Sequence, residues 1–497
     1  MSLDHFKSAQ ILRPMPNIGC LFDIMTGRYY RGKDGESILN GGLPNFNGVA
    51  GLPNMFKTVI SLFMNGSVLE RYGSSVMTAH DAENTLSMER ITSLLRFFPS
   101  LKNRDLVGEG RLHFSDASVY MGNEWFDDLK SYSDIRKAIP DKERLTTPFY
   151  NHRTQQPVKI PSITLSFLDS LSGLITDNIQ KMFDKNEIGE SGLNMLAMKA
   201  SGAKSQIVEQ MTSVASPASI FATMTAHVGE KPQLDPYKPN IKKLKFLKGD
   251  LNLKRVPENF SFLSGCTWHC ANMFVMMDDN KVPEFPRDEN DDLKGDTDLI
   301  AITIVPLRNK FGPSGIPFDI VVSQSEGVKV GLTEYYYLKS YNYYGLSDPN
   351  GNMAKGKPNY RLDLYPDVAL SRKSIRRVVE TDPYLARALT ITSEMCQMKN
   401  LWHHLEEGVL CTPKQLYADL KAKGYDWSIL LDSRGFWTFE EDNHPLPFLS
   451  TMDLLNMRLG IYHPKWYPKS LEEMGHPQSA TVAEAPASKE SKTVTPA

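Results

Sequence analysis

The sequence predicts an α/β fold in which a mostly parallel sheet is flanked by helices, with a smaller α+β domain at the C-terminal end. Three features support it. Val49-Ala50 leads through a glycine turn into the apolar run 59–63, the order strand, turn, helix. Residues 163–168 form a mainly apolar run, Ile-Thr-Leu-Ser-Phe-Leu, as in central parallel strands buried on both faces. Residues 376–470 alternate helical patterns with an expected hairpin of strands 428–431 and 436–440.

Composition excludes several classes of protein. The chain has 497 residues, of which 41% are apolar and 23% charged, as in ordinary globular proteins of two or three domains. Its net charge of −2 provides no global attraction to nucleic acid or membrane, so such binding requires a local patch. Five cysteines indicate a reducing compartment without a disulfide framework. No apolar run approaches the ~18–20 residues that span a bilayer, so we expect a cytoplasmic protein without a membrane partner.

Four segments are expected along the chain. The first is short and amphipathic, and its prolines at positions 14 and 16 end any helix. It is too short to fold alone, so it packs on its own domain or on a neighbouring subunit. The last is low in complexity and is expected to be disordered. The boundaries are 1–25 for a protomer-contact segment, 26–345 for the core, 346–475 for the C-terminal domain and 476–497 for the tail.

The core is organised around Gly51-Leu-Pro-Asn-Met-Phe-Lys57-Thr58. Backbone N–H groups at a helix start point at an anion, so this turn, with Gly51, Asn54 and Phe56, is a candidate phosphate cradle. Lys57 would reach the β- and γ-phosphates, and the Thr58 hydroxyl would bind Mg²⁺. Phe56 stands where the P-loop pattern has a second glycine. The alternative is a glycine turn with a solvated lysine.

Three polar residues each end or follow a strand-like run. Glu83 could polarise a water that attacks the γ-phosphate, although an acidic helix cap is favoured on the residues alone. Asp169 stands where a Walker B aspartate holds Mg²⁺ through water, and the alternative is a turn starter. His227 could hydrogen-bond the γ-phosphate, or be a partly exposed histidine at a strand end.

Two cations, Arg308 and Lys310, follow the strand expected at 299–307. They could contact a phosphate across a subunit interface, as arginine fingers do. A solvated turn is the alternative.

Residues 231–255 carry eight lysines and arginines against two aspartates, with aromatic and apolar side chains between them. Such a segment can follow a nucleic-acid backbone and insert among bases, although a charge run is more often a solvated face. The excess of positive charge in a near-neutral chain favours nucleic acid. The candidate DNA-binding residues are Lys238, Lys242, Lys243, Lys245, Phe246, Lys248, Lys254 and Arg255.

The order of these parts resembles the core of RecA-type strand-exchange recombinases, most closely the bacteriophage UvsX-like branch, over roughly residues 20–345. The resemblance implies a RecA-like P-loop ATPase core. It makes Gly51–Thr58 the Walker A loop, Glu83 the activator of the attacking water and Asp169 the Walker B residue. It also makes His227 the γ-phosphate sensor, and it implies that Arg308 and Lys310 contact ATP bound by the adjacent protomer.

Other parts correspond less closely to that family. The resemblance implies DNA-binding loops at about 185–195 and 228–258, but the second is longer and richer in lysine than the usual version. Arg90 stands where the family often has an adenine-stacking tyrosine, which leaves the base contact open. Residues 346–410 have no counterpart.

The resemblance implies a Mg²⁺- and DNA-dependent ATPase that forms filaments on single-stranded DNA. It would promote homologous pairing and strand exchange in recombination, repair and recombination-dependent replication. Its partners would be single- and double-stranded DNA, copies of itself, and single-strand-binding and mediator proteins, in the host cytoplasm if the protein is phage-encoded. Two alternatives stay open. One is a hexameric replicative helicase of the same fold. The other is a DNA-binding filament or mediator protein with a regulatory, weakly hydrolysing ATP site. Phe56 and Arg90 are the residues that support this second alternative.

Overall fold

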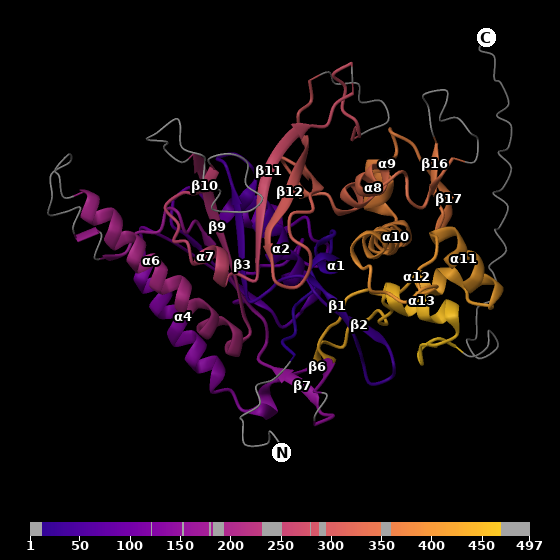
Figure 1. Cartoon of the computed structure of the whole chain (residues 1–497), viewed down its shortest axis with the longest axis horizontal. Coiled ribbons are helices and arrows are strands. Elements are labelled where there is room, and N and C mark those ends of the chain that lie inside the picture. Colours follow the sequence, from indigo (N-terminus) through magenta and orange to yellow (C-terminus); the bar gives the residue numbers. More distant parts are fainter. Residues whose placement is uncertain are drawn as a thin grey trace, which may run out of the picture. The chain divides into compact units, whose positions relative to one another are not determined.

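A mostly parallel β-sheet organises the chain (Figure 1). The computed structural model describes residues 12–120, 122–151, 154–177, 180–181, 193–230, 251–278, 280–287, 295–348 and 359–468. Residues up to Tyr462 belong to one unit, and those from His463 onward form a second. The N-terminal residues 1–11, the tail from 469 and most of both predicted DNA-binding loops lie outside the described residues.

The strand order of the main sheet is β14-β13-β12-β11-β3-β9-β8-β4-β5, with β10 paired to β9. Strands β11, β3, β9, β8, β4 and β5 run parallel, and β12, β13 and β14 extend the sheet antiparallel. The bounds are β3 Phe46–Gly51, β4 Val76–Asp81, β5 Leu112–Asp116, β8 Thr164–Asp169, β9 Ile220–Glu230, β10 Leu251–Leu253, β11 Cys266–Val275, β12 Leu299–Asn309, β13 Phe318–Ser323 and β14 Gly327–Val328.

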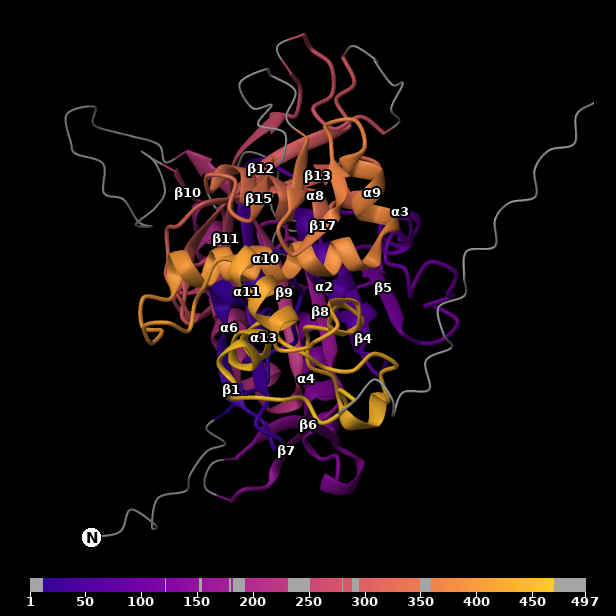
Figure 2. The same ribbon diagram turned by 90° about the vertical axis from the view of Figure 1, so that its right-hand side faces the viewer.

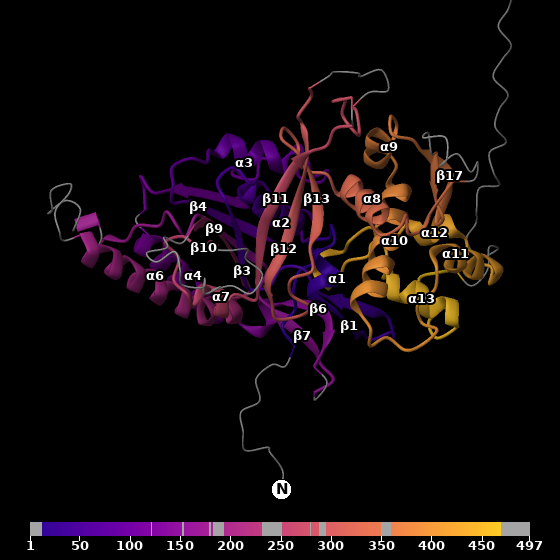
Figure 3. The ribbon, with the colours of Figure 1, turned by 45° about the horizontal axis from the view of Figure 1, so that its top comes forward.

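Alternating residues of β3 show how the two faces are covered. Phe46 belongs to an apolar cluster with helices α4 (Gly122–Lys137) and α6 (Leu193–Ala215). The next residue, Asn47, points to the other face, where its amide donates to Met64 Sδ of α2 (Lys57–Arg71) at 3.4 Å. Figure 3 shows α4 and α6 on the side of the sheet away from α2 and α3 (Met88–Leu95). The sheet is therefore covered on both faces, as a parallel sheet requires.

The remaining elements of the first unit surround this core. Helix α10, in which ten of the nineteen residues are buried, packs on α8 and α1; α8 and α10 are seen in Figure 2. Shorter sheets join β1 to β2, β6 to β7, and β15 through β17. The bounds are α1 Phe22–Thr26, β1 Arg28–Arg31, β2 Ser37–Asn40, β6 Leu145–Tyr150, β7 Pro157–Ile160, α7 Phe260–Leu263, α8 Val330–Ser340, β15 Leu346–Ser347, β16 Tyr360–Leu362, β17 Tyr365–Leu370, α9 Ile375–Thr381, α10 Pro383–Leu401, α11 Pro413–Ala422, α12 Trp427–Leu431 and α13 Thr451–Leu459, with 3₁₀ turns at Asp141–Glu143, Ser216–Ala218 and Glu440–Asp442.

The predicted fold class is confirmed: a mostly parallel, helix-flanked sheet is followed by a smaller part with helices and a three-stranded sheet. The hairpin predicted at 428–431 and 436–440 is wrong. Asp426 accepts the N–H of Ser428 at 2.9 Å and caps a short helix, α12, instead. A brief apolar run such as Ile-Leu-Leu cannot by itself separate strand from helix. None of the helices in the described part of the chain has the length and apolarity to cross a membrane.

The C-terminal helices are joined to the start of the described chain by buried polar contacts. Gln397 of α10 donates to the carbonyl of Leu21 at 2.7 Å, and the Trp437 indole donates to the carbonyl of Met15 at 2.9 Å. Trp437 is 1% exposed and contacts the ring of Tyr72, which follows α2. These contacts hold residues from the C-terminal part against the start of the described chain and the end of α2. The domain boundary at 345/346 stays a prediction.

Candidate functional site

The strand register brings three of the predicted site positions, together with Asp81, to one edge of the sheet. Gly51 at the end of β3 lies opposite His227 of β9, and Asp81 at the end of β4 lies opposite Asp169 of β8. All four strands are parallel, so these are their carboxyl ends, where ligands bind in open α/β sheets. Residues far apart in sequence are thus neighbours because the ladder pairs them.

The turn between β3 and α2 has the backbone shape of a phosphate loop without its second glycine. Phe56 precedes α2 with φ 54° and ψ 25°, in the left-handed region, and Asn54 also has a positive φ of 60°. Glycine adopts this conformation freely, whereas other residues pay about 1–2 kcal/mol. The carbonyl of Phe56 accepts the N–H of Ile60 at 3.0 Å, so the helix begins at Lys57 as predicted.

Lys57 is buried at the start of α2. It is 7% exposed, and its ammonium donates to the carbonyl of Leu52 in the same loop at 2.9 Å. Burial lowers the pKa of Lys57, and the nearby Cys270, Asp169 and Glu83 act against that shift. The cation is therefore held over the loop, close to two carboxylates.

Asp169 is the centre of a hydroxyl-rich contact. The hydroxyls of Thr58 and Thr225 donate to its two carboxylate oxygens, each at 2.5 Å. Burial raises the pKa of Asp169; the two hydroxyls oppose this, and the charges of Glu83 and Asp81 add to it. The sequence analysis missed Thr225, although a threonine in the buried strand β9 signals a polar contact there.

The oxygen atoms of Thr58 and Asp169 are suitable ligands for a hard divalent cation. Thr58 and Asp169 supply a hydroxyl and a carboxylate that already touch, and Mg²⁺ prefers oxygen ligands of this kind. The raised pKa of Asp169 follows from a buried carboxylate that has only hydroxyl partners. A cation beside it would favour the ionised form.

Glu83 is positioned by the turn that Asp81 forms. One Asp81 oxygen accepts the N–H of Glu83 at 2.9 Å, and the other accepts the N–H groups of Thr85 and Leu86 at 2.6 and 2.5 Å. The helix cap that the residues alone favoured is instead Ser87, whose hydroxyl accepts the N–H of Arg90 at 3.2 Å at the start of α3. The side chain of Glu83 is available for other contacts.

Glu83 contacts both Ser170 and His227. The Ser170 hydroxyl donates to Glu83 Oε1, and His227 Nε2 lies 2.8 Å from the same oxygen. Burial raises the pKa of Glu83, but these hydrogen bonds and the charges of His227 and Lys57 outweigh it, so its pKa lies below the ordinary value. The carboxylate is therefore ionised at neutral pH. The sequence analysis missed the role of Ser170.

A second set of contacts joins His227 to the base of the basic segment. The backbone N–H of His227 donates to the Ser172 hydroxyl at 2.9 Å, and that hydroxyl donates to the carbonyl of Lys254 at 2.9 Å. The N–H of Lys254 in turn donates to the carbonyl of His227 at 2.7 Å. The buried Lys204 ammonium contacts the carbonyls of Ser172 and Arg255 at 2.9 and 3.3 Å.

Among the predicted DNA-binding residues, only Lys254 and Arg255 lie in the described part of the chain. Both follow β10, which pairs with β9 just beyond His227. The residues that lie outside the described part are Lys238, Lys242, Lys243, Lys245, Phe246 and Lys248.

Arg308 and Lys310 do not join the Glu83 site within one chain. The ladder pairs Thr267 with Arg308, whereas Cys270 pairs with Gly51. At about 3.3 Å per residue, Arg308 is displaced by roughly 10 Å along the strands from the P-loop end. Lys310 is exposed and donates to the carbonyl of Leu263 at 3.4 Å. Burial and the charge of Arg308 lower the pKa of Lys310.

Arg90 lies on α3 beside the turn between β13 and β14. Its guanidinium donates to the carbonyl of Gln324 at 3.1 Å, and the Gln324 amide donates to the carbonyl of Thr297 at 2.7 Å. No contact between Arg90 and the P-loop occurs among the described residues. Its role toward a base stays a prediction, and Gln324 is a neighbour that the sequence did not indicate.

No protein-family model matches the chain, and no curated protein matches it. Among solved structures, the chain is similar to the RadB recombinase with a TM-score of 0.30 and 14% identity, over 58% of this chain and 92% of that one. It is also similar to a DnaB-like replicative helicase with a TM-score of 0.31 and 12% identity, over 58% of each chain. Neither likeness bears on the UvsX-like branch, which stays a prediction.

The conformation of Phe56 leads to a stability prediction. Phe56→Ala and Phe56→Gly both remove the ring, but only glycine also removes the left-handed strain. We expect Phe56→Gly to be more stable than Phe56→Ala by about 1 kcal/mol. Urea unfolding of the two variants measures the difference, and equal midpoints with equal slopes would show that the position is unstrained.

Proposed function

We propose that the chain is an ATP-dependent DNA recombinase that assembles as a filament on single-stranded DNA and promotes homologous pairing and strand exchange. The observation that carries this is Glu83, an ionised carboxylate held between Ser170 and His227 at the sheet edge where the P-loop ends. The contact between Glu83 and His227 joins a candidate water-activating group to a candidate phosphate sensor.

The chemistry follows from the positions of the described groups. Loop N–H groups and Lys57 would hold the β- and γ-phosphates, with Thr58 and Asp169 placed to hold Mg²⁺, which neutralises phosphate charge when bound. Glu83 accepts a hydrogen bond from the attacking water and orients it toward the γ-phosphate. Its lowered pKa keeps it in the accepting form at neutral pH.

His227 supports a link between nucleotide and DNA. Its imidazole contacts Glu83, while its backbone is hydrogen-bonded to Lys254 and Ser172 at the base of the basic segment. A γ-phosphate would compete with Glu83 for the imidazole. If the histidine moves, Lys254 and Arg255 would move with it. The ATP-bound and ATP-free states would then differ in their affinity for DNA, as coupling between the two sites requires.

Arg308 and Lys310 support a site shared between copies. Their displacement from the P-loop end within one chain leaves them free to contact ATP held by a neighbouring copy in a head-to-tail assembly. Arg308 Nε is buried without a hydrogen-bond partner among the described residues.

The role of Glu83 predicts a separation of binding from turnover. Glu83→Gln keeps the side-chain shape but cannot activate water, so we expect ATP turnover to fall at least about 100-fold while ATP-dependent DNA binding is preserved. Glu89→Gln, an exposed acid on α3, is the matched control and should turn over normally. Turnover is measured by phosphate release and DNA binding by fluorescence anisotropy.

Normal turnover in Glu83→Gln would overturn the assignment. Electron microscopy of the same variant with ATP and single-stranded DNA then separates the two oligomeric forms. The proposal expects helical filaments, whereas closed rings would favour the replicative-helicase alternative.

A shared site predicts complementation between two inactive variants. Glu83→Gln keeps the cations, and the double variant Arg308→Ala, Lys310→Ala keeps Glu83. A junction between two copies is complete when Glu83 of one copy meets Arg308 and Lys310 of the next. In an equal mixture, random head-to-tail assembly produces such junctions at roughly a quarter of the contacts. We therefore expect the mixture to regain about a quarter of normal turnover, measured after co-assembly on DNA. No recovery above the separate variants would place the cations outside the site.

A further inference from the structure

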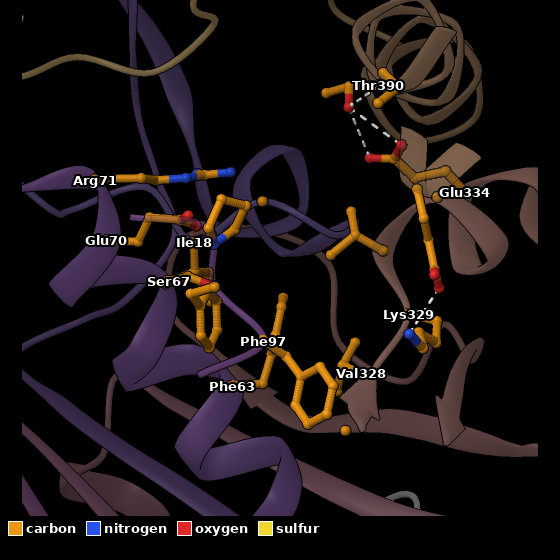
Figure 4. Close-up of a pocket in the computed structure, with 18 of the residues that line it drawn as sticks. Ile18, Phe63, Ser67, Glu70, Arg71, Phe97, Val328, Lys329, Glu334 and Thr390 are labelled. Atoms are coloured by element: carbon orange, nitrogen blue, oxygen red, sulfur yellow. Dashed lines mark hydrogen bonds and ion pairs between the residues drawn. The ribbon is translucent and has the colours of Figure 1, made fainter. Parts of the chain in front are cut away.

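A cavity of about 780 Å³ lies away from the Glu83 site, between the P-loop helix and the C-terminal helices (Figure 4). Helix α2 and the segment after α3 line one side, and the start of α8 together with α10 lines the other. Lys57, Thr58, Glu83 and Asp169 are not part of its lining. Its volume is within the range of small-molecule sites.

Glu334 is the buried acid of this cavity that lacks a charged partner. It is 2% exposed, and the Thr390 hydroxyl lies 3.1 Å from each of its carboxylate oxygens. No cation lies within ion-pair distance of it among the described residues. A hydroxyl has a single proton to donate, so most of the hydrogen-bonding capacity of the carboxylate is unused.

Two other charged groups that line the cavity, Asp23 and Lys329, have charged partners. Asp23 accepts the N–H groups of Ile18 and Gly19 at 2.8 and 2.9 Å and lies 3.6 Å from Arg71. Lys329 pairs with both Glu326 and Glu380. Glu394 also lines the cavity and accepts a hydrogen bond from the Thr451 hydroxyl, but it is less buried than Glu334. Burial raises the pKa of Glu334 to about 8.

Another part of the cavity wall is apolar and aromatic. Figure 4 shows Arg71 and Glu334 extending from facing walls, with Phe63, Phe97 and Val328 gathered between them at one end. Phe63 is 6% exposed, whereas Phe97 is 47% exposed and offers its ring to a ligand. Lys329 lies 5.8 Å from the Phe97 ring centroid, so this ring already has a cation near its face.

We propose that the cavity is a binding site for a small organic cation, an amine with an apolar or aromatic body. Its ammonium group would donate to Glu334, and its body would lie against Phe63, Phe97 and Val328. An anion is disfavoured because Arg71 is paired with Asp23 and stacks on Phe436 at 4.7 Å, and because Glu334 and Glu394 both line the cavity. The inference does not rest on the proposed function.

The ligand would contact the helix that carries the candidate phosphate-binding residues. Phe63, Ser67 and Arg71 line the cavity from α2, whose first two residues are Lys57 and Thr58. The site is therefore placed to influence nucleotide binding through that helix. Binding at the cavity is nevertheless a separate property, and it should persist in Lys57→Ala.

The test is calorimetric titration of the full-length protein with three probes that share a phenyl body. They are 2-phenylethylammonium, neutral 2-phenylethanol and anionic 3-phenylpropionate. At pH 8.5 an alkylammonium stays charged, as a lysine amine with a pKa of about 10.4 does. We expect the ammonium to bind at least tenfold more tightly than the alcohol, and the carboxylate to bind most weakly. Equal binding of all three, or tightest binding of the carboxylate, would overturn the proposal.

Variants locate the binding. Glu334→Gln should weaken the ammonium at least tenfold, whereas Glu380→Gln, which removes a lining acid already paired with Lys329, should leave its affinity unchanged. Phe97→Ala changes a half-exposed ring and should weaken all phenyl probes without affecting folding. Thermal unfolding confirms that each variant is folded. Unchanged ammonium affinity in both Glu334→Gln and Phe97→Ala would show that the probe binds elsewhere.

Discussion

The parallel register of the central sheet is the constraint on which the candidate site depends. Pairing Gly51 with His227 and Asp81 with Asp169 places the ends of four strands at one edge. Asp81, Asp169 and His227 are then contributed by three of these strands, and β3 leads into the loop before Lys57, so the site is assembled by backbone ladders and not by any continuous stretch of sequence. A shift of one residue in any ladder would turn these side chains to the other face of the sheet.

Around that edge, neighbouring groups shift the pKa values of two carboxylates in opposite directions. Glu83 is ionised because Ser170, His227 and Lys57 outweigh its burial, whereas Asp169 has two hydroxyl partners and a raised pKa. Two neighbouring carboxylates are thus tuned in opposite directions by their surroundings. This division suits one acid for orienting water and the other for a cation.

Local pattern was sufficient to predict some of this from sequence. The helix Lys57–Arg71 and the strand ending at Asp169 follow from apolar runs bounded by a glycine turn and a polar tip. The conformation of Phe56 explains how the loop forms without its second glycine. Contacts such as Ser170 to Glu83, Thr225 to Asp169 and Arg90 to Gln324 join distant segments, and no local pattern specifies them. The helix at 427–431 was missed because its apolar run is too short to show a period.

We propose that this edge of the sheet is the ATP site of a DNA-dependent motor. Steady-state ATP turnover with and without single-stranded DNA, beside a Lys57→Ala control, tests it most directly. The account predicts strong stimulation by DNA that the control loses. Negligible turnover with intact ATP-dependent DNA binding would instead indicate a regulatory filament. Absence of both nucleotide binding and turnover would contradict the account.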